Sequence, residues 1–239
     1  MICVKVVDIL PSALQRPPMD QMRPIWKPLP HATAIRGQSM VKSLGIPAFI
    51  VPTDHGRVSF TEVKVPHSCI LGGEGKALQV VQHFFNENRI RQAASSLGAA
   101  QYCINESVNY AMQRAPFGKP LSSNQGIQFP LVELQTQAEM LRALIHRTAW
   151  QMDTKGAFSV SDKISMCNFV ANRLCCDAAD QAMQVHGGLG YSRHAPFEHI
   201  YRHHRRYRIT EGTEEIQKRR VAGYMFGFMD RKAPKGVRI

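Results

Sequence analysis

Two long stripes of apolar residues restrict the fold of this chain more than any other feature. In the segments 122–153 and 160–185, apolar residues recur at alternating steps of mostly four and three, which places them on one face of an α-helix. A third segment, 86–114, contains no proline and has apolar residues at helical spacing. Because such faces must be buried against partners, the pattern predicts a helical bundle over the second part of the chain.

The first third of the chain has a different character. Residues 2–10 have the apolar, β-branched composition of a buried strand, and residues 11–30 are dense in proline and are expected to be irregular. We therefore expect a β-type part over residues 1–75, a helical domain over residues 76–230 and a basic tail over residues 231–239. The predicted fold class is mainly α.

Composition and cysteine spacing indicate a globular protein without a metal site. Of 239 residues, 44% are hydrophobic and 20% charged, and no apolar run is long enough to cross a bilayer. The six cysteines include no CxxC pair, which predicts buried free thiols in a reducing compartment. The N-terminus lacks signal-peptide features, so we expect an intracellular protein; the sequence does not separate mitochondrial, peroxisomal and cytoplasmic locations.

The chain is strongly basic, with a formal net charge of +12. Such a charge suits nucleic acid or a ligand rich in phosphate. The positive residues are spread along the chain, with local concentrations at 202–208, 218–220 and 231–238. No zinc finger, RNA-recognition signature or basic-region helix accompanies them. Nucleic acid is therefore not the expected partner.

One acidic residue, Glu211, lies on a predicted loop between a basic run and the last helix. Gly212 follows it, and Thr213 is a suitable N-cap for a helix expected from near Glu214 to about Met225. A carboxylate at this place can act as a catalytic base or can pair with the arginines that precede it. The residues of the loop alone favour the ion pair.

Five short motifs follow one another through the helical part, at residues 85–89, 110–121, 184–191, 196–198 and 211–217. Singly, each has a structural explanation, such as a helix surface, a helix-ending loop or a packed histidine. In this order, joined by helices of fitting length, they closely resemble the C-terminal half of the acyl-CoA dehydrogenase family of flavoproteins. The resemblance covers roughly residues 45–226 and implies that family's four-helix-bundle-type domain, preceded by a truncated fragment of its middle β-domain.

The resemblance implies an oxidoreductase that uses FAD to remove hydrogen from the α and β carbons of an acyl-CoA thioester. Glu211 matches the catalytic base, which takes the α-proton while the β-hydrogen leaves as a hydride to flavin N5. Asn86, Arg89 and Gly212 match substrate-binding positions. The positions that the resemblance assigns to FAD are Arg114, Phe117, Gln125, Gln184, Val185, His186, Gly187, Gly188, Thr213 and Glu215.

The resemblance also implies partners. FAD bridges subunits in this family, so a homodimer or homotetramer is expected, together with an electron acceptor such as an electron-transfer flavoprotein. The family's N-terminal helical domain and the first strands of its middle domain have no counterpart in this sequence. We therefore expect a truncated member, whose isolated chain binds FAD weakly or not at all.

Three residues depart from the family's usual pattern. Asn86 stands where aspartate is common, His203 where an aspartate usually follows arginine, and Thr210 where an aromatic residue is common. Two alternatives to a dehydrogenase stay open. One is a non-enzymatic helical module of the same ancestry that oligomerises or binds nucleic acid, and the other is a flavoenzyme of the acyl-CoA oxidase or nitroalkane oxidase type.

Overall fold

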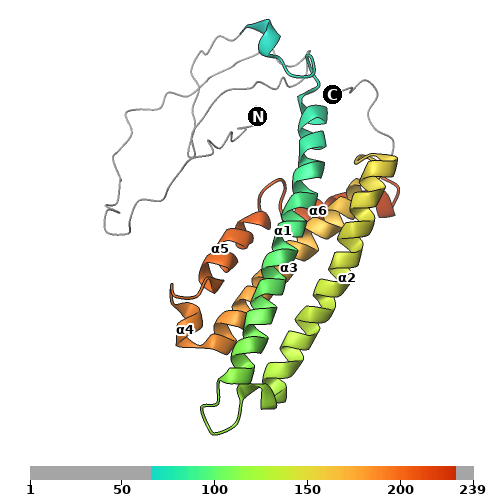
Figure 1. Cartoon of the computed structure of the whole chain (residues 1–239). Helices are drawn as coiled ribbons and strands as arrows, with labels where there is room; N and C mark the ends of the chain where they lie inside the picture. The colour runs from blue at the N-terminus through green and yellow to red at the C-terminus, as the bar shows by residue number, and fades with distance from the viewer. Residues whose placement is uncertain (1–65, 230–239) are drawn as a thin grey trace, which may run out of the picture. The chain divides into compact units, whose positions relative to one another are not determined.

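The computed structural model describes residues 66–229, most of which form α-helices (Figure 1). The helices are α1 (Ala77–Gln113), α2 (Gln125–Lys155), α3 (Ser161–His186), α4 (Gly188–Tyr191), α5 (Phe197–Tyr207) and α6 (Glu214–Met225), with short 3-10 turns η2 (His67–Cys69) and η3 (Leu121–Ser123). This part of the chain contains no strand, so the mainly α fold class is confirmed. Most of the expected β-type part and the basic tail lie outside the described residues, and the proposed domain division stays a prediction.

The described residues fall into two units, residues 66–82 in the first and residues 83–229 in the second. In the first unit the described residues comprise η2, a turn after it and the start of α1. The second unit holds the remaining helices and every residue that the sequence assigned to a site. The helices of the second unit therefore position all the candidate site residues.

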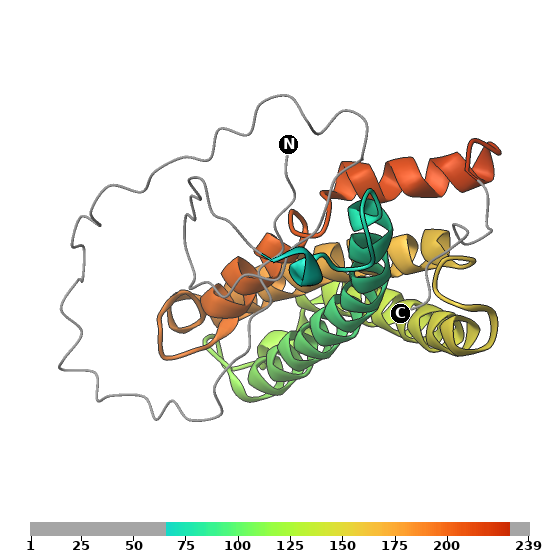
Figure 2. The ribbon, with the colours of Figure 1, turned by 90° about the horizontal axis from the view of Figure 1, so that it is seen from above.

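The core of the second unit lies between α1, α2, α3 and α5. Its buried side chains include Leu97 and Ile104 of α1, Leu141 of α2, Leu174 of α3 and Phe197 of α5. α3 also packs against α6, and the view from above shows these two helices next to each other (Figure 2). The apolar stripes predicted on α2 and α3 are the faces that form this core. None of the helices in residues 66–229 is long and apolar enough to cross a membrane.

Small side chains on α3 let its neighbours pack closely. Four free cysteines lie in the core, two of them adjacent on α3: Cys103, Cys167, Cys175 and Cys176. Burial raises the pKa of the Cys103 thiol to about 12 and that of Cys167 to about 11. These thiols therefore stay protonated at neutral pH, and the expectation of buried free thiols is confirmed for them.

Helix α5 was not predicted from the sequence, where its second half reads only as a basic run. Its fully buried side chains are Phe197 and His204, so it lacks the apolar stripe that marked the longer helices. An ion pair of 3.3 Å between Arg202 and Glu198, spaced four residues apart, is the local signal that favours a helix. α5 packs on α3 and ends just before the loop that carries Glu211.

Candidate active site around Glu211

The loop between α5 and α6 holds Glu211 in a conformation that few residues adopt. Glu211 has a φ of +52° and Gly212 a φ of +102°, both in the left-handed region. A Cβ atom at position 212 would lie 3.0 Å from the side chain of Ile216 and 3.3 Å from side-chain nitrogens of Arg89 and Gln217. The loop therefore needs glycine at 212 for its backbone angle and for its packing.

Two buried side chains hold the backbone of this loop. Arg89 is 1% exposed and donates hydrogen bonds from Nε, at 3.1 Å, and from Nη2 to the carbonyl oxygen of Glu211. Gln217 Nε2 donates to the same carbonyl at 3.2 Å and to that of Gly212 at 2.9 Å. Burial and the nearby charge of Arg220 lower the pKa of Arg89 to about 10, so the guanidinium stays charged at neutral pH.

The half-buried carboxylate of Glu211 is bound by two neutral amides from α1. Asn88 Nδ2 donates to Oε1 at 2.6 Å, and Gln92 Nε2 donates to Oε2 at 2.5 Å. Asn88 and Gln92 are four residues apart and share one face of the helix. Each carboxylate oxygen thus has one donor, which fixes the orientation of the group without neutralising its charge.

Glu214, rather than Glu211, is the acid that pairs with the arginine at the end of the basic run. Arg208 Nε contacts one oxygen of the Glu214 carboxylate, and Arg173 Nη2 lies 2.5 Å from the other. Burial alone would raise the pKa of the Glu214 carboxyl, but the hydrogen bonds from Arg173 and Arg208 lower it overall. The ion-pair interpretation of this segment therefore applies to Glu214, while Glu211 is bound by amides.

A second buried network fixes the start of the loop. Ser96 Oγ donates to Asn172 Oδ1 at 2.6 Å, and Asn172 Nδ2 donates to the carbonyl of Tyr207 at 3.0 Å. Ser96 also lies 2.8 Å from His204 Nδ1, and because its only proton goes to Asn172, this nitrogen of His204 must be the donor. The network joins α1 and α3 to the last turn of α5.

Several buried polar atoms on α1, the loop and α6 have no hydrogen-bond partner in the described structure. Those nearest to the candidate site in sequence are both polar atoms of the Asn86 side chain, Arg89 Nη1, Thr210 Oγ1 and Gln217 Oε1. Buried polar atoms are normally paired with protein, water or ligand. Of the three expected substrate-binding residues, Arg89 and Gly212 lie next to Glu211. The third, Asn86, is 0% exposed, and both polar atoms of its side chain are without a hydrogen-bond partner.

The residues expected to bind FAD fall into separate groups, and one of these lies on the hairpin between α1 and α2. Arg114, Phe117 and Gln125 are exposed there, Phe117 to 94%. The loop is closed by a hydrogen bond of 2.8 Å from the N–H of Leu121 to the carbonyl of Arg114. The end of α1 follows Arg89 by 24 residues, a distance of about 36 Å along the helix. The hairpin group is therefore remote from Glu211 within one chain.

A second group lies where α3 ends. Gln184 is exposed, whereas the side chains of Val185 and His186 are buried. The His186 ring packs against Tyr110, with centroids 4.3 Å apart, and its Nδ1 lies 2.8 Å from the carbonyl of Ala182. Val185 can therefore offer only backbone atoms to a cofactor, and the ring of His186 is held by its packing against Tyr110.

The glycines that follow α3 expose their backbone. Gly187 has a φ of +61°, and a Cβ atom added at Gly187 or Gly188 would meet nothing within 4 Å. Bare backbone of this kind can approach the phosphates of a dinucleotide. The exposed glycines and Gln184 fit the assigned group, since they leave room for a ligand at this end of the bundle.

Thr213 and Glu215, the last residues assigned to FAD, lie at the start of α6. Thr213 occupies the N-cap position as predicted, but its side chain does not make the expected capping hydrogen bond. Glu215 is exposed, and the pKa of its carboxyl is lowered because the carboxylate accepts hydrogen bonds from its own backbone N–H and from the Thr213 hydroxyl. Both residues remain accessible for contacts to a bound group.

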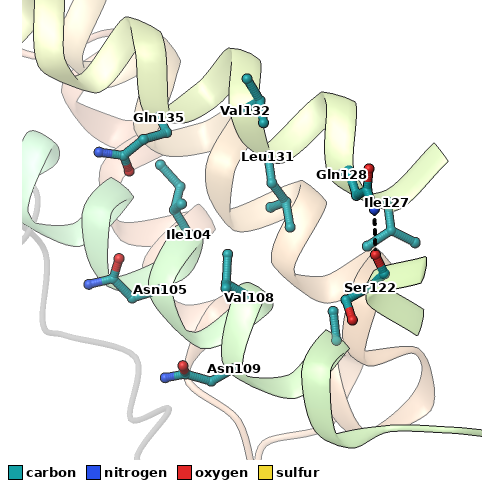
Figure 3. A pocket seen from close by; sticks show the side chains of 11 residues that line it. Ile104, Asn105, Val108, Asn109, Ser122, Ile127, Gln128, Leu131, Val132 and Gln135 are labelled. Atoms are coloured by element: carbon teal, nitrogen blue, oxygen red, sulfur yellow. Dashed lines mark hydrogen bonds between the residues drawn. The ribbon is translucent and has the colours of Figure 1, made fainter. Parts of the chain in front are cut away.

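A pocket of ≈ 540 Å³ lies away from Glu211, between α1 and α2 (Figure 3). The residues that line it are Ile104, Asn105, Val108, Asn109, Ala111, Ser122, Ile127, Gln128, Leu131, Val132 and Gln135. None of the residues assigned to the site from the sequence is among them. Within residues 66–229, no group of three or more His, Cys, Asp or Glu side chains is placed to hold a metal ion.

Comparison with known proteins identifies the family. Residues 75–226 match the family model described as acyl-CoA dehydrogenase, C-terminal domain. The chain belongs to the acyl-CoA dehydrogenase family. It is 35% identical over 168 residues to an acyl-CoA dehydrogenase of Bacillus subtilis, a match that covers 70% of this chain and 44% of the relative. It is 32% identical over 164 residues to the caffeyl-CoA reductase-Etf complex subunit CarC of Acetobacterium woodii, covering 69% and 43%.

Solved structures of acyl-CoA dehydrogenases share the same helices. The butyryl-CoA dehydrogenase of Megasphaera elsdenii superposes with a TM-score of 0.65 and 31% identity, over 70% of this chain and 43% of that enzyme. The chain spans a little less than half the length of the curated relatives it matches. The family's C-terminal helical domain therefore accounts for the bundle of residues 83–229.

Sequence reasoning missed two residues that contact the Glu211 carboxylate. Asn88 and Gln92 were not assigned to a site from the sequence, and their partner lies 123 and 119 residues further along the chain. Gln217 was also missed, and it is 0% exposed. One signal for Asn88 and Gln92 was present in the sequence: they are four residues apart, share a face of α1 and lie close to Arg89 of the 85–89 motif.

Proposed function

We propose that this chain supplies the catalytic base of a flavin-dependent acyl-CoA dehydrogenase, and that the base is Glu211. The observation that carries the proposal is a half-buried carboxylate, bound by neutral amides rather than by a cation, on a backbone that Arg89 and Gln217 hold in place. A carboxylate base must be able to accept a proton, and an arginine paired with the carboxylate would compete with that proton. Glu214 has such partners and is therefore not the candidate.

The proposed reaction begins with proton transfer to Glu211. A carboxylate oxygen of Glu211 takes the proton from the α carbon of the thioester, and the electron pair of that C–H bond forms the α,β double bond. Bound FAD would accept the β-hydrogen, with its electron pair, at flavin N5. The thioester is thereby oxidised to a 2-enoyl-CoA, and Glu211 must release its proton before the next turnover.

An α-proton becomes acidic only when the thioester carbonyl is hydrogen-bonded. The N–H groups of Glu211 and Gly212 take no part in the backbone hydrogen bonds of residues 66–229. In this proposal the N–H of Glu211 donates to the carbonyl, as the family resemblance implies. The unused atoms of Asn86 and Nη1 of Arg89 would bond polar groups of the CoA thioester.

The cofactor contacts of the proposed enzyme come from more than one copy of the chain. Thr213 and Glu215 lie directly after Glu211, whereas the hairpin group of Arg114, Phe117 and Gln125 lies about 36 Å away along α1. In a homodimer or homotetramer the hairpin group, with Gln184 and the two glycines, would contact the FAD of a neighbouring subunit. The Acetobacterium woodii relative is named as a subunit of a reductase-Etf complex, which favours an electron-transfer flavoprotein as a partner of this chain.

The proposal is tested with Glu211→Gln in an FAD-loaded, full-length context, since the isolated chain is expected to bind FAD weakly or not at all. Butyryl-CoA, mixed with the protein without oxygen, should bleach the flavin absorbance, and the variant should slow the bleaching by on the order of 10²- to 10⁴-fold because it lacks the base. Glu133→Gln, an exposed acid on α2, is the matched control and should bleach at the unaltered rate. Bleaching by Glu211→Gln at the unaltered rate would contradict the proposal.

A further inference from the structure

A buried chain of hydrogen bonds connects α3 to Glu211 through Gln92. Asn168 Nδ2 donates to Gln92 Oε1 at 3.1 Å and to the backbone carbonyl of Arg89 at 3.2 Å. Gln92 Nε2 then donates to Glu211 Oε2 at 2.5 Å. Gln92 is 6% exposed and Asn168 is 1% exposed, so little water reaches either amide.

The orientation of the Gln92 amide follows from its neighbours. A backbone carbonyl only accepts hydrogen bonds, so the Asn168 atom beside the carbonyl of Arg89 must be its NH2 group. The same NH2 group lies against Gln92, which requires the oxygen of Gln92 on that side. The NH2 group of Gln92 therefore faces Glu211, whose ionised carboxylate only accepts.

Asn88 shows the same polarity on the exposed side of the site. Arg91 Nη2 donates to Asn88 Oδ1 at 2.8 Å, so the NH2 group of Asn88 faces Glu211. Arg91 is exposed, and water can replace it at little cost. The buried arm through Gln92 has no such replacement, so it is the stronger determinant of the orientation of Glu211.

We propose that Gln92 and Asn168 are positioning residues for the base. Asn168 fixes the direction of the Gln92 amide, and Gln92 holds the Glu211 carboxylate in one orientation while each oxygen keeps a lone pair for the α-proton. Neither residue touches the substrate in this account. The inference rests on the proposed function of Glu211, but the hydrogen bonds that it invokes can be measured separately.

The variant Asn168→Asp tests the chain of hydrogen bonds that runs from Asn168 through Gln92 to Glu211. Aspartate cannot donate, so the Gln92 amide turns to donate to residue 168 and presents its oxygen to the Glu211 carboxylate, which repels it. Asn109→Asp is the control, because Asn109 is exposed on α1, lines the pocket and has no contact with Gln92 or the Glu211 loop. Asn168→Leu removes the donor without adding a charge and serves if Asn168→Asp does not fold.

The first measurement is the side-chain amide signal of Gln92 in an ¹H–¹⁵N NMR spectrum of the 239-residue chain, assigned by its loss in Gln92→Leu. The signal should be protected from solvent exchange and shifted downfield by its bond to a carboxylate. The chemical shift of this signal should change in Asn168→Asp (or in Asn168→Leu) and in Glu211→Gln, and should be unchanged in Asn109→Asp. A Gln92 signal that is unchanged in the Asn168 and Glu211 variants overturns the proposed positioning of Glu211 by Gln92 and Asn168, even where Glu211→Gln is inactive.

The second measurement separates turnover from binding in the FAD-loaded protein with butyryl-CoA. Asn168→Asp should lower kcat by about 10- to 100-fold with KM within about twofold, because the base is misplaced while the substrate contacts stay. An unchanged kcat overturns the positioning role. Full turnover by Glu211→Gln, with a Gln92 signal that responds as expected, overturns instead the proposed function on which that role rests.

Discussion

The two ends of the helix α1 lie in opposite surroundings. In the first half of the helix, Asn88, Arg89 and Gln92 bond the Glu211 loop; Ser96, at the midpoint, bonds α3 and lies beside α5. Towards its end, the apolar side chains of Ile104, Val108 and Ala111 line an open pocket against α2. The first region is a network of mostly buried polar groups, and the second is a mainly apolar surface with exposed side chains.

The polar region and the apolar region of α1 suit different tasks. A buried polar network holds one arrangement because each donor has a specific acceptor, so it suits a base whose orientation matters. An apolar surface lacks that specificity but gains free energy from any partner that covers it. We therefore expect changes at the Glu211 end to alter stability and chemistry, and changes at the pocket end to alter association.

The largest contrast is expected between two glycines with positive φ. Gly212→Ala adds a Cβ atom against Ile216, Arg89 and Gln217 at φ +102°, whereas Gly118→Ala at φ +77° meets nothing within 4 Å. Backbone strain alone should cost about 1 to 2 kcal/mol at Gly118, and strain with overpacking about 3 to 4 kcal/mol at Gly212. Chemical denaturation measures both, and equal losses would show that the Glu211 loop is no more tightly packed than the hairpin.

The next contrast concerns pH. Burial, with the charges of His203, Arg206 and His199, lowers the pKa of His204 from 6.5 to about 4. Between these values the unfolded chain binds a proton that the folded chain does not, so stability is lost as the pH falls through this window. Between pH 7 and pH 5 the loss attributable to His204 should be about 2 kcal/mol.

The pH effect is checked by urea denaturation of His204→Gln at both pH values. Glutamine can still donate to Ser96 but does not titrate, so the variant should lose about 2 kcal/mol less than the unaltered chain. His194→Gln changes an exposed histidine and should keep the full loss. An identical pH dependence in all three proteins would contradict the assigned protonation of His204.

The smallest effect is expected at the pocket end. Val132 is 61% exposed at the pocket, and Phe129 is 55% exposed nearby on α2. If this surface contributes to a homodimer or homotetramer, Val132→Lys should weaken self-association about tenfold, which is about 1.4 kcal/mol. Ala143→Lys, exposed elsewhere on α2, is the control. Sedimentation velocity measures the association, and equal association of Val132→Lys and the unaltered chain would exclude the pocket from the interface.

The sequence predicted most of the fold and the identity of the candidate base, but not the contacts of that base. The stripes at 122–153 and 160–185 predicted α2 and α3 closely, because a buried helix face imposes a regular spacing of apolar residues. α5 was missed because its buried face contains a histidine instead of an apolar stripe. The amides of Asn88 and Gln92 were missed because only tertiary packing brings them to Glu211.

The central claim, that Glu211 removes the α-proton, is tested most directly by hydrogen exchange in a substrate that cannot be oxidised. In 3,3-dimethylbutyryl-CoA the β carbon carries no hydrogen, so only the proton step can occur. The FAD-loaded protein in D2O should introduce deuterium at the α carbon, as followed by mass spectrometry. Glu211→Gln should slow this exchange by on the order of 10²- to 10⁴-fold, whereas exchange at the unaltered rate in the variant would contradict the account.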